Sequence, residues 1–301
     1  MLGLGACGSC NEEASPRSTA GPGALAVKDD LGRRITLPRP ARRIASLAPS
    51  NTETLFAVGC GDRVVLRDRL SSYPAAAGRL PATNPFHVSP EHVAGFSPDL
   101  VLLSHADASR VAALRRIGLQ VAVFDPRNLD RVFANITAIG ALCGARKRAE
   151  RLVGRLRRRV RRVVTAVKGR PRPGVFIETD GTDPLKPWTA GRGSFVDELV
   201  TLAGGRNLAN KLGRPYAQVN AEEVLRGDPE LILVMGVDRA SRRMMGGLRR
   251  LRARPGWREL EAVRRGRVID DIHADLLSRP GPRLVDGLEA LARALHPEAR
   301  W

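Results

Sequence analysis

The residues of this chain best suited to chemistry by type are its four cysteines. Cys7 and Cys10 have the spacing of a CxxC motif, which can hold a metal ion or carry out thiol–disulfide exchange. Neither a second CxxC nor a pair of histidines accompanies this motif, so metal or redox use is not predicted. Cys60 and Cys143 stand alone, and the sequence leaves open whether they are buried thiols or one disulfide.

Motifs for nucleophilic catalysis, metal-dependent hydrolysis and phosphate binding are absent from the sequence. It contains no GxSxG, no HExxH and no Walker motif. The glycines at 59–61 and 204–205 follow expected helices, whereas a phosphate-binding loop precedes one. Serine, histidine and aspartate are present, but no spacing nominates a catalytic triad. Binding is therefore favoured over catalysis, and an α/β enzyme with a site between two lobes is the alternative.

Strands and helices alternate along most of the chain, which predicts an α/β fold with parallel sheets. Residues 25–37 are expected to form a hairpin, and residues 43–47 a buried strand. Ser50 or Asn51 is expected to cap the helix that follows. From 129 to 167 the pattern is helical apart from a break near Gly140 to Gly144, so one long helix should follow the break.

The long helix divides the chain into halves of similar size. A chain of 301 residues with 43% apolar residues can fill two α/β lobes. We expect an N-terminal lobe over 25–143, a bridging helix over 144–169 and a C-terminal lobe over 170–301. Residues 8–24 are rich in Gly, Ser, Pro, Ala and Thr, which predicts a flexible tether within residues 1–24. Ligands of such proteins bind between the lobes, near strand C-termini and helix N-termini.

An internal repeat links the two halves and singles out a pair of glutamates. Residues 88–102 align without a gap on residues 219–233, with Val, Glu, Pro and Leu recurring at the same places. Each copy predicts a short helix, a proline turn and a buried strand. Glu91 and Glu222 fall at the same position near each helix start. Because acidic residues favour helix N-termini, local capping is the alternative to a binding role.

The formal net charge of +19 invites a nucleic-acid interpretation. The densest basic run, Arg151 to Arg162, has apolar residues at helical spacing, which favours a solvated helix face. No zinc-finger, RNA-recognition or helix-turn-helix signature is present, so nucleic acid is not expected as a partner. The positive charge would still suit an anionic membrane surface or an acidic ligand.

The first residues of the chain resemble the end of an export signal. Leu4-Gly5-Ala6-Cys7 resembles the lipobox of bacterial lipoproteins, in which the cysteine is lipidated. The charged and long apolar stretches that usually precede a lipobox are missing. The tether-like composition that follows supports the interpretation, so Cys7 is the expected lipidation site.

Four stretches resemble the helical-backbone (class III) substrate-binding proteins of ABC importers, the group that carries cobalamin, ferric siderophores and haem. They are Arg43 to Glu53, Ser89 to Val101, Trp188 to Gly205 and Gln218 to Val224. The resemblance implies two Rossmann-like lobes with central parallel sheets, joined by a single long α-helix, with a ligand cleft between them. It also implies tight binding without catalysis or a cofactor, by a monomer in the periplasm or at the cell surface.

Members of this family dock on the transmembrane subunits of their permease through one exposed glutamate from each lobe. Each glutamate meets arginine on the transporter. Glu91 and Glu222 match these positions, and arginine–carboxylate pairs form paired hydrogen bonds well. The resemblance therefore implies ABC permease subunits as partners.

The cobalamin-binding members imply a cleft lined by aromatic side chains, with an aspartate and an arginine four residues apart near the end of the chain. A flat macrocycle needs aromatic faces and a few polar groups. The Asp/Arg spacing also fits an ordinary ion pair within a helix. The implied ligand-binding residues are Tyr73, Phe86, Trp188, Tyr216, Asp275 and Arg279.

The identity of the ligand is the most specific expectation that follows from the resemblance. Cobalamin is expected first, with a ferric siderophore or haem as alternatives. Arg67 and Arg192 would suit an anionic siderophore. Haem-binding relatives place an axial ligand in the loop that contains His87, so His87 is a candidate haem ligand, against the alternative of a solvated loop histidine. His273, near Asp275, is a second candidate of the same kind, and no further metal ligand is expected.

Overall fold

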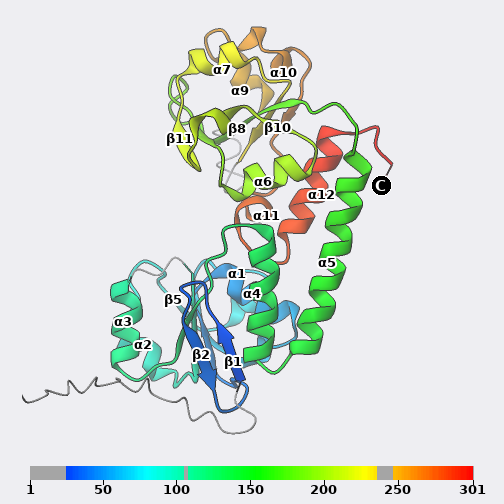
Figure 1. Cartoon of the computed structure of the whole chain (residues 1–301). Helices are drawn as coiled ribbons and strands as arrows, with labels where there is room; N and C mark the ends of the chain where they lie inside the picture. The colour runs from blue at the N-terminus through cyan, green and yellow to red at the C-terminus, as the bar shows by residue number, and fades with distance from the viewer. Residues whose placement is uncertain (1–24, 105–107, 236–246, 301) are drawn as a thin grey trace, which may run out of the picture.

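The computed structural model describes residues 25–104, 108–235 and 247–300 (Figure 1). Two sheets dominated by parallel strands lie in the two halves of the chain, with helices packed around them, which confirms the expected α/β fold. An antiparallel hairpin of β1 (Leu25–Lys28) and β2 (Arg34–Leu37) lies at the N-terminal end of the described chain.

The N-terminal sheet has five parallel strands in the order β5-β4-β3-β6-β7. Buried apolar runs such as Leu100–Leu103 form its centre, as expected for strands covered on both faces. The strands are β3 (Ile44–Ser46), β4 (Val64–Asp68), β5 (Ala82–Thr83), β6 (Leu100–Leu103) and β7 (Val121–Val123).

The C-terminal sheet has six strands in the order β11-β9-β8-β12-β13, with β10 paired to β8. The strands β8, β10, β12 and β13 are parallel, while β9 is antiparallel to both β8 and β11. The strands are β8 (Gly174–Asp180), β9 (Trp188–Ala190), β10 (Arg206–Asn207), β11 (Tyr216–Gln218), β12 (Leu231–Val234) and β13 (Val268–Ile269).

The helices of the N-terminal half are α1 (Pro49–Ala57), α2 (Pro90–Gly95), α3 (Ala108–Arg116) and α4 (Leu129–Leu142). The long helix α5 (Arg146–Val167) follows. The later helices are α6 (Phe195–Leu202), α7 (Ala221–Gly227), α9 (Leu248–Ala253), α10 (Glu261–Arg264), α11 (Asp275–Ser278) and α12 (Leu284–Leu295).

Helix α5 runs along both halves of the molecule (Figure 1). One stripe of it, including Leu152, Leu156 and Val163, is buried against α4, α12 and α6. The largest core cluster contains side chains from α1, α5 and α6, so the halves share one continuous core along this helix. A shared core of this kind limits hinge motion, because opening the halves would expose apolar surface to water.

The internal repeat is confirmed in the structure. The first copy forms α2 and β6, and the second forms α7 and β12, so the alignment superposes helix on helix and strand on strand. Val93 and Val224 are buried at matching places. Each strand has a neighbour on both sides in its sheet, so each copy supplies a central strand.

The expected cap of α1 is wrong. Ala48 is the N-cap and Pro49 opens the helix, and no side chain caps it. Proline suits this position because its missing N–H would have no helical partner there. The Asn51 side chain instead donates a hydrogen bond to the carbonyl of Leu103, at 3.0 Å, and so joins α1 to the end of β6.

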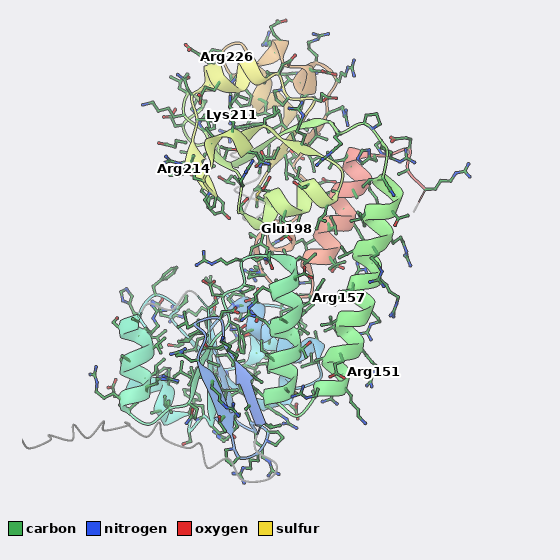
Figure 2. All side chains as sticks on the ribbon, viewed as in Figure 1. Arg151, Arg157, Glu198, Lys211, Arg214 and Arg226 are labelled. Carbon is green, nitrogen blue, oxygen red and sulfur yellow. A yellow bond between two sulfur atoms is a disulfide. The ribbon has the colours of Figure 1, made fainter. Side chains whose placement is uncertain are left out.

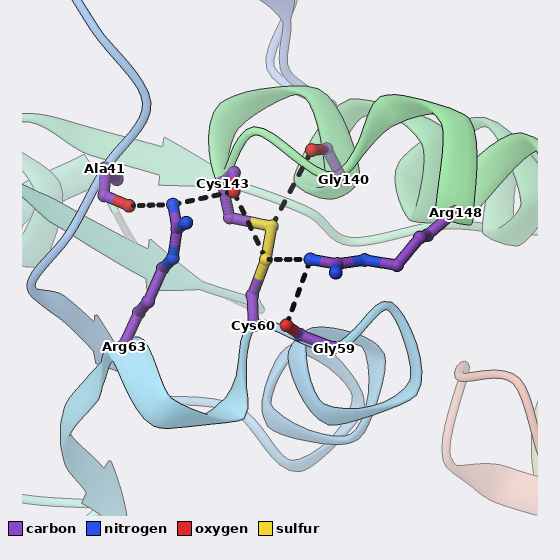
Figure 3. The surroundings of a disulfide bond; sticks show 7 residues. All are labelled: Ala41, Gly59, Cys60, Arg63, Gly140, Cys143 and Arg148. Atoms are coloured by element: carbon purple, nitrogen blue, oxygen red, sulfur yellow. Dashed lines mark hydrogen bonds between the residues drawn. A yellow bond between two sulfur atoms is a disulfide. The ribbon is translucent and has the colours of Figure 1, made fainter.

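Cys60 and Cys143 form a disulfide, which settles the alternative that the sequence left open (Figure 3). The bond joins the turn after α1 to the end of α4, across 83 residues. Arg63 donates to the carbonyl of Cys143 at 2.8 Å, and Arg148 donates to the carbonyl of Gly59 at 3.1 Å (Figure 3). Two arginines therefore tie down the backbone around the bond.

Candidate functional site

The carboxyl edge of the N-terminal sheet meets the C-terminal half of the chain at two places. The start of α1, which follows β3, lies against the turn around Gly281. The start of α4, which follows β7, receives the side chain of Glu198 from α6, whose Oε2 accepts from the Leu129 N–H at 2.9 Å. In parallel α/β sheets this edge is where ligands bind.

Asp275, the first residue of α11, and Arg279, which follows the helix, form an ion pair. The Nε of Arg279 lies 2.8 Å from the Oδ1 of Asp275, and both side chains are partly exposed. The N–H of Asp275 donates to Nδ1 of His273 at 3.2 Å. The structure thus pairs the aspartate and the arginine and leaves some of their polar atoms accessible.

The turn after this pair carries Arg283 onto Glu53 of α1. The backbone N–H and the Nε of Arg283 both donate to the Glu53 carboxylate, at 3.0 and 2.8 Å. Burial raises the pKa of Glu53, and the bonds from Arg283 and the nearby charge of Arg279 oppose that rise. The Arg283 guanidinium also stacks 3.6 Å from the ring centroid of Tyr73, so one face of Tyr73 is covered.

Neither Glu53 nor Arg283 was predicted from the sequence to have a role at the site. Glu53 belongs to one of the resembling stretches, but an acidic residue early in a helix carries no sign of a partner 230 residues away. An excess of arginine over the chain hides which arginines are paired. Only the approach of the two halves identifies this contact.

Trp188 and Tyr216 lie on adjacent antiparallel strands. Trp188 is opposite Gln218 and Ala190 is opposite Tyr216. Residues two apart in a strand share a face, so the two aromatic side chains are diagonal neighbours on one face of the sheet. They are 43% and 52% exposed, which places both outside the core.

Phe86 and His87 lie in the loop that follows β5. Phe86 is 73% exposed, and its N–H donates to Asn84 Oδ1 at 3.0 Å. His87 is also exposed. Within the described parts of the chain, no group of three His, Cys, Asp or Glu side chains could hold a metal ion.

Glu91 and Glu222 occupy the second position of α2 and of α7. Both are exposed. The Ser89 hydroxyl donates to Glu91 Oε2 at 2.8 Å, and the backbone N–H of Glu91 together with this hydroxyl lowers the pKa of its carboxyl. Helices α2 and α7 lie on the side of the molecule away from α5 (Figure 1).

The expected lipidation site, Cys7, lies outside the described residues. Over the part of the chain that the structure does describe, no helix has the length and apolar character needed to cross a membrane.

Comparisons with known proteins agree on one family. The sequence profile of a family described as periplasmic binding protein matches residues 44–273. An uncharacterized ABC transporter substrate-binding lipoprotein of Bacillus subtilis is 28% identical over 283 residues, covering 91% of this chain and 86% of its own length.

Two solved structures are also similar. The periplasmic vitamin B12 binding protein of Vibrio cholerae matches with a TM-score of 0.71 and 27% identity, over 86% of this chain and 98% of its own. A periplasmic haem-binding protein of Roseiflexus, in its apo form, matches with a TM-score of 0.75 and 28% identity, over 85% and 98%.

Proposed function

Because this chain belongs to the periplasmic binding protein family, we propose that it captures cobalamin or a related corrinoid outside the cytoplasm and delivers it to an ABC permease. Members of the family bind solutes, so the chain is the substrate-binding protein of an ABC importer and not an enzyme. The corrinoid is the finer proposal, and the Vibrio cholerae protein supports it by a likeness that spans both halves of the chain.

The observation that carries the ligand proposal is the exposed aromatic pair of Trp188 and Tyr216 on β9 and β11. Soluble proteins seldom leave two large aromatic side chains together on one open face without a use for it. A corrin ring is broad and flat, and aromatic faces of this kind provide large contact area with little loss of side-chain freedom.

Polar anchoring is assigned to Asp275 and Arg279. Corrinoids carry amide side chains, which both donate and accept hydrogen bonds. The carboxylate of Asp275 can accept from an amide, and the guanidinium of Arg279 can donate to an amide oxygen. Their mutual 2.8 Å contact holds both groups in place before the ligand arrives, which lowers the entropy cost of binding. Phe86 and the open face of Tyr73 complete the proposed contact set.

Delivery is assigned to Glu91 and Glu222. Both are exposed at the same helix position in the two copies of the repeat. The carboxyl of Glu91 is ionised at neutral pH, and hydrogen bonds from its own backbone N–H and from Ser89 lower its pKa further. Two carboxylates presented by two structurally equivalent helices fit a partner that has two equivalent arginine sites.

Haem is the second candidate. His87 is exposed beside Phe86 in the loop after β5, so an imidazole could reach an iron centre next to an aromatic ring. A ferric siderophore would leave the histidine unused and depend on cationic residues such as Arg192 and Arg279. The guanidinium of Arg67 instead donates to the backbone carbonyls of Asp68, Arg69 and Gly78.

Equilibrium dialysis of the purified chain against cyanocobalamin, haemin and a ferric siderophore panel tests these proposals. Submicromolar cobalamin binding that weakens at least about tenfold in Trp188→Ala would support the corrinoid assignment. Leu185→Ala is the matched control, because Leu185 is another exposed apolar residue, 58% exposed, before β9. Tight binding of haemin or a siderophore alone would contradict cobalamin and keep the class.

A further inference from the structure

One face of α5 is basic along most of its length. The helix contains ten arginine and lysine residues and a single acid, Glu150. At 100° per residue, six of the ten point away from the buried stripe of Leu152 and Leu156. These six residues form the α5 basic face: Lys147, Arg151, Arg155, Arg158, Arg161 and Arg162, all exposed.

The carboxylates of α12 beside this face are already used by another arginine. Arg159 binds Asp286 and Glu289 of α12, at 2.6 and 2.8 Å, on the flank of α5. These bonds lower the pKa of Glu289, and the nearby charge of Arg162 lowers it further. Among the described residues, no side chain of the α5 basic face forms an ion pair. Their positive charges are therefore available to a partner.

The geometry of the face suits an extended anionic surface. Lys147 and Arg162 are separated by a rise of about 22 Å along the helix axis, so the charges extend as a row along the helix. Arg151 lies on the outer side of α5, whereas Arg157 stacks 5.6 Å from the ring centroid of Phe133 on α4 (Figure 2). Glu289 of α12 lies beside Arg155, Arg158 and Arg162, but its ion pairs are with Arg159 and Arg293.

Nucleic acid fits this face less well. Helix α5 is packed along its length against α4, α12 and α6, so it does not project from the fold as a helix that enters a DNA major groove does. The α5 basic face contains no aromatic residue on which an unpaired base could stack. Lipid phosphates on a membrane surface require neither groove entry nor stacking.

We propose that the α5 basic face binds the phosphate groups of an anionic lipid bilayer. Guanidinium groups pair with phosphate oxygens through two parallel hydrogen bonds, and a row of them matches a plane of headgroups. A binding protein that serves a membrane permease works next to such a surface. This proposal depends on the extracytoplasmic location but not on the identity of the ligand.

Binding through α5 turns the proposed docking residues away from the membrane. Helices α2 and α7, which carry Glu91 and Glu222, lie on the side opposite to α5 (Figure 1). The bilayer and the permease therefore hold the protein in two different orientations. The bilayer-bound orientation keeps the protein near its transporter without occupying it.

Vesicle co-sedimentation tests the proposal. The full chain, with Cys7→Ser to prevent lipidation, is mixed with phosphatidylglycerol or with phosphatidylcholine vesicles. The test variant is Arg151→Gln/Arg158→Gln/Arg162→Gln. The control is Lys211→Gln/Arg214→Gln/Arg226→Gln, which removes the same charge from exposed residues of the C-terminal half (Figure 2). Circular dichroism and cyanocobalamin binding show whether each variant is folded.

We expect binding to phosphatidylglycerol only, weakening as salt rises. The α5 variant should lose at least about tenfold in affinity, and the control less than about threefold. Equal losses in the two variants would overturn the proposal in favour of net charge alone. Absence of vesicle binding, or tighter binding to duplex DNA that the α5 variant abolishes, would also overturn it. None of these results would affect the ligand assignment, which rests on dialysis.

Discussion

Arg283 donates its backbone N–H and its Nε to the buried carboxylate of Glu53, at 3.0 and 2.8 Å. The contact joins α1 to the residue before α12, and the same guanidinium stacks on Tyr73. One arginine thus connects the two halves of the molecule and orients an aromatic side chain that we assign to the ligand. The other proposed polar anchor, Arg279, is close enough to Glu53 to influence its pKa.

Arg283→Met should lower the free energy of unfolding by about 3 kcal/mol at neutral pH, because it leaves the Glu53 carboxylate buried without its partner. Loss of the partner raises the pKa of Glu53 further. A buried acid with a raised pKa destabilises the fold as pH rises from below 4.5 through that pKa, so the loss should be smaller in acid. Urea unfolding at several pH values measures this. Arg293→Met, an exposed position on α12, should change stability by less than about 0.5 kcal/mol.

Glu198 offers a paired test of the second contact between the halves. Burial and the nearby charges of Asp130 and Asp197 raise the pKa of Glu198, against the effect of the Leu129 N–H. The folded state therefore binds this proton more tightly than the unfolded state does, and stability decreases as pH rises through the raised pKa. Glu198→Gln removes that decrease and keeps an oxygen that can accept from the Leu129 N–H.

We expect Glu198→Gln to gain stability relative to the wild type between acid and neutral pH, by less than about 1 kcal/mol because the site is half exposed. Glu198→Ala removes the acceptor and should cost about 1 kcal/mol at both pH values. Thermal unfolding at pH 4 and pH 7 separates the two variants. A glutamine variant that loses as much stability as the alanine variant would contradict this account.

The disulfide gives a third prediction. Cys60 and Cys143 close a loop across 83 residues, so Cys60→Ser/Cys143→Ser should lower stability by about 4.5 kcal/mol on a loop-entropy account. Reduction of the wild-type protein should produce a similar change in the urea midpoint. Cys7→Ser/Cys10→Ser is the control and should leave the midpoint unchanged. If reduction has no effect on the wild type, the bond does not contribute to stability.

Glu91→Arg/Glu222→Arg tests permease docking. Replacement of both carboxylates should reduce ligand-dependent stimulation of the cognate transporter's ATPase at least about tenfold, because like charges would face each other. Cobalamin affinity should be unchanged, since neither residue belongs to the proposed ligand set. Glu223→Gln, the next residue on α7, is the matched control. Full stimulation by the double variant would contradict the docking role. The two glutamates would then only stabilise the N-termini of α2 and α7.

Much of the architecture could be predicted because its causes are local. Alternating apolar runs indicated the parallel sheets, and the glycines near 140–144 marked the break between α4 and α5. The repeat placed Glu91 and Glu222 at equivalent positions, since helix starts and buried strands leave periodic patterns in sequence. The cap of α1 was missed because Asn51 has a distant partner, the carbonyl of Leu103.

The sequence by itself determined the fold class, the two-copy organisation and the family, all of which depend on periodicity and short motifs. The tertiary structure alone decided which distant side chains meet. Trp188 and Tyr216 become neighbours through strand register, Cys60 bonds Cys143 across 83 residues, and Arg283 reaches Glu53 across 230. Such contacts depend on how the sheets and α5 pack in three dimensions. The pattern of a single sequence does not indicate which residues that are far apart in the chain lie close together in space.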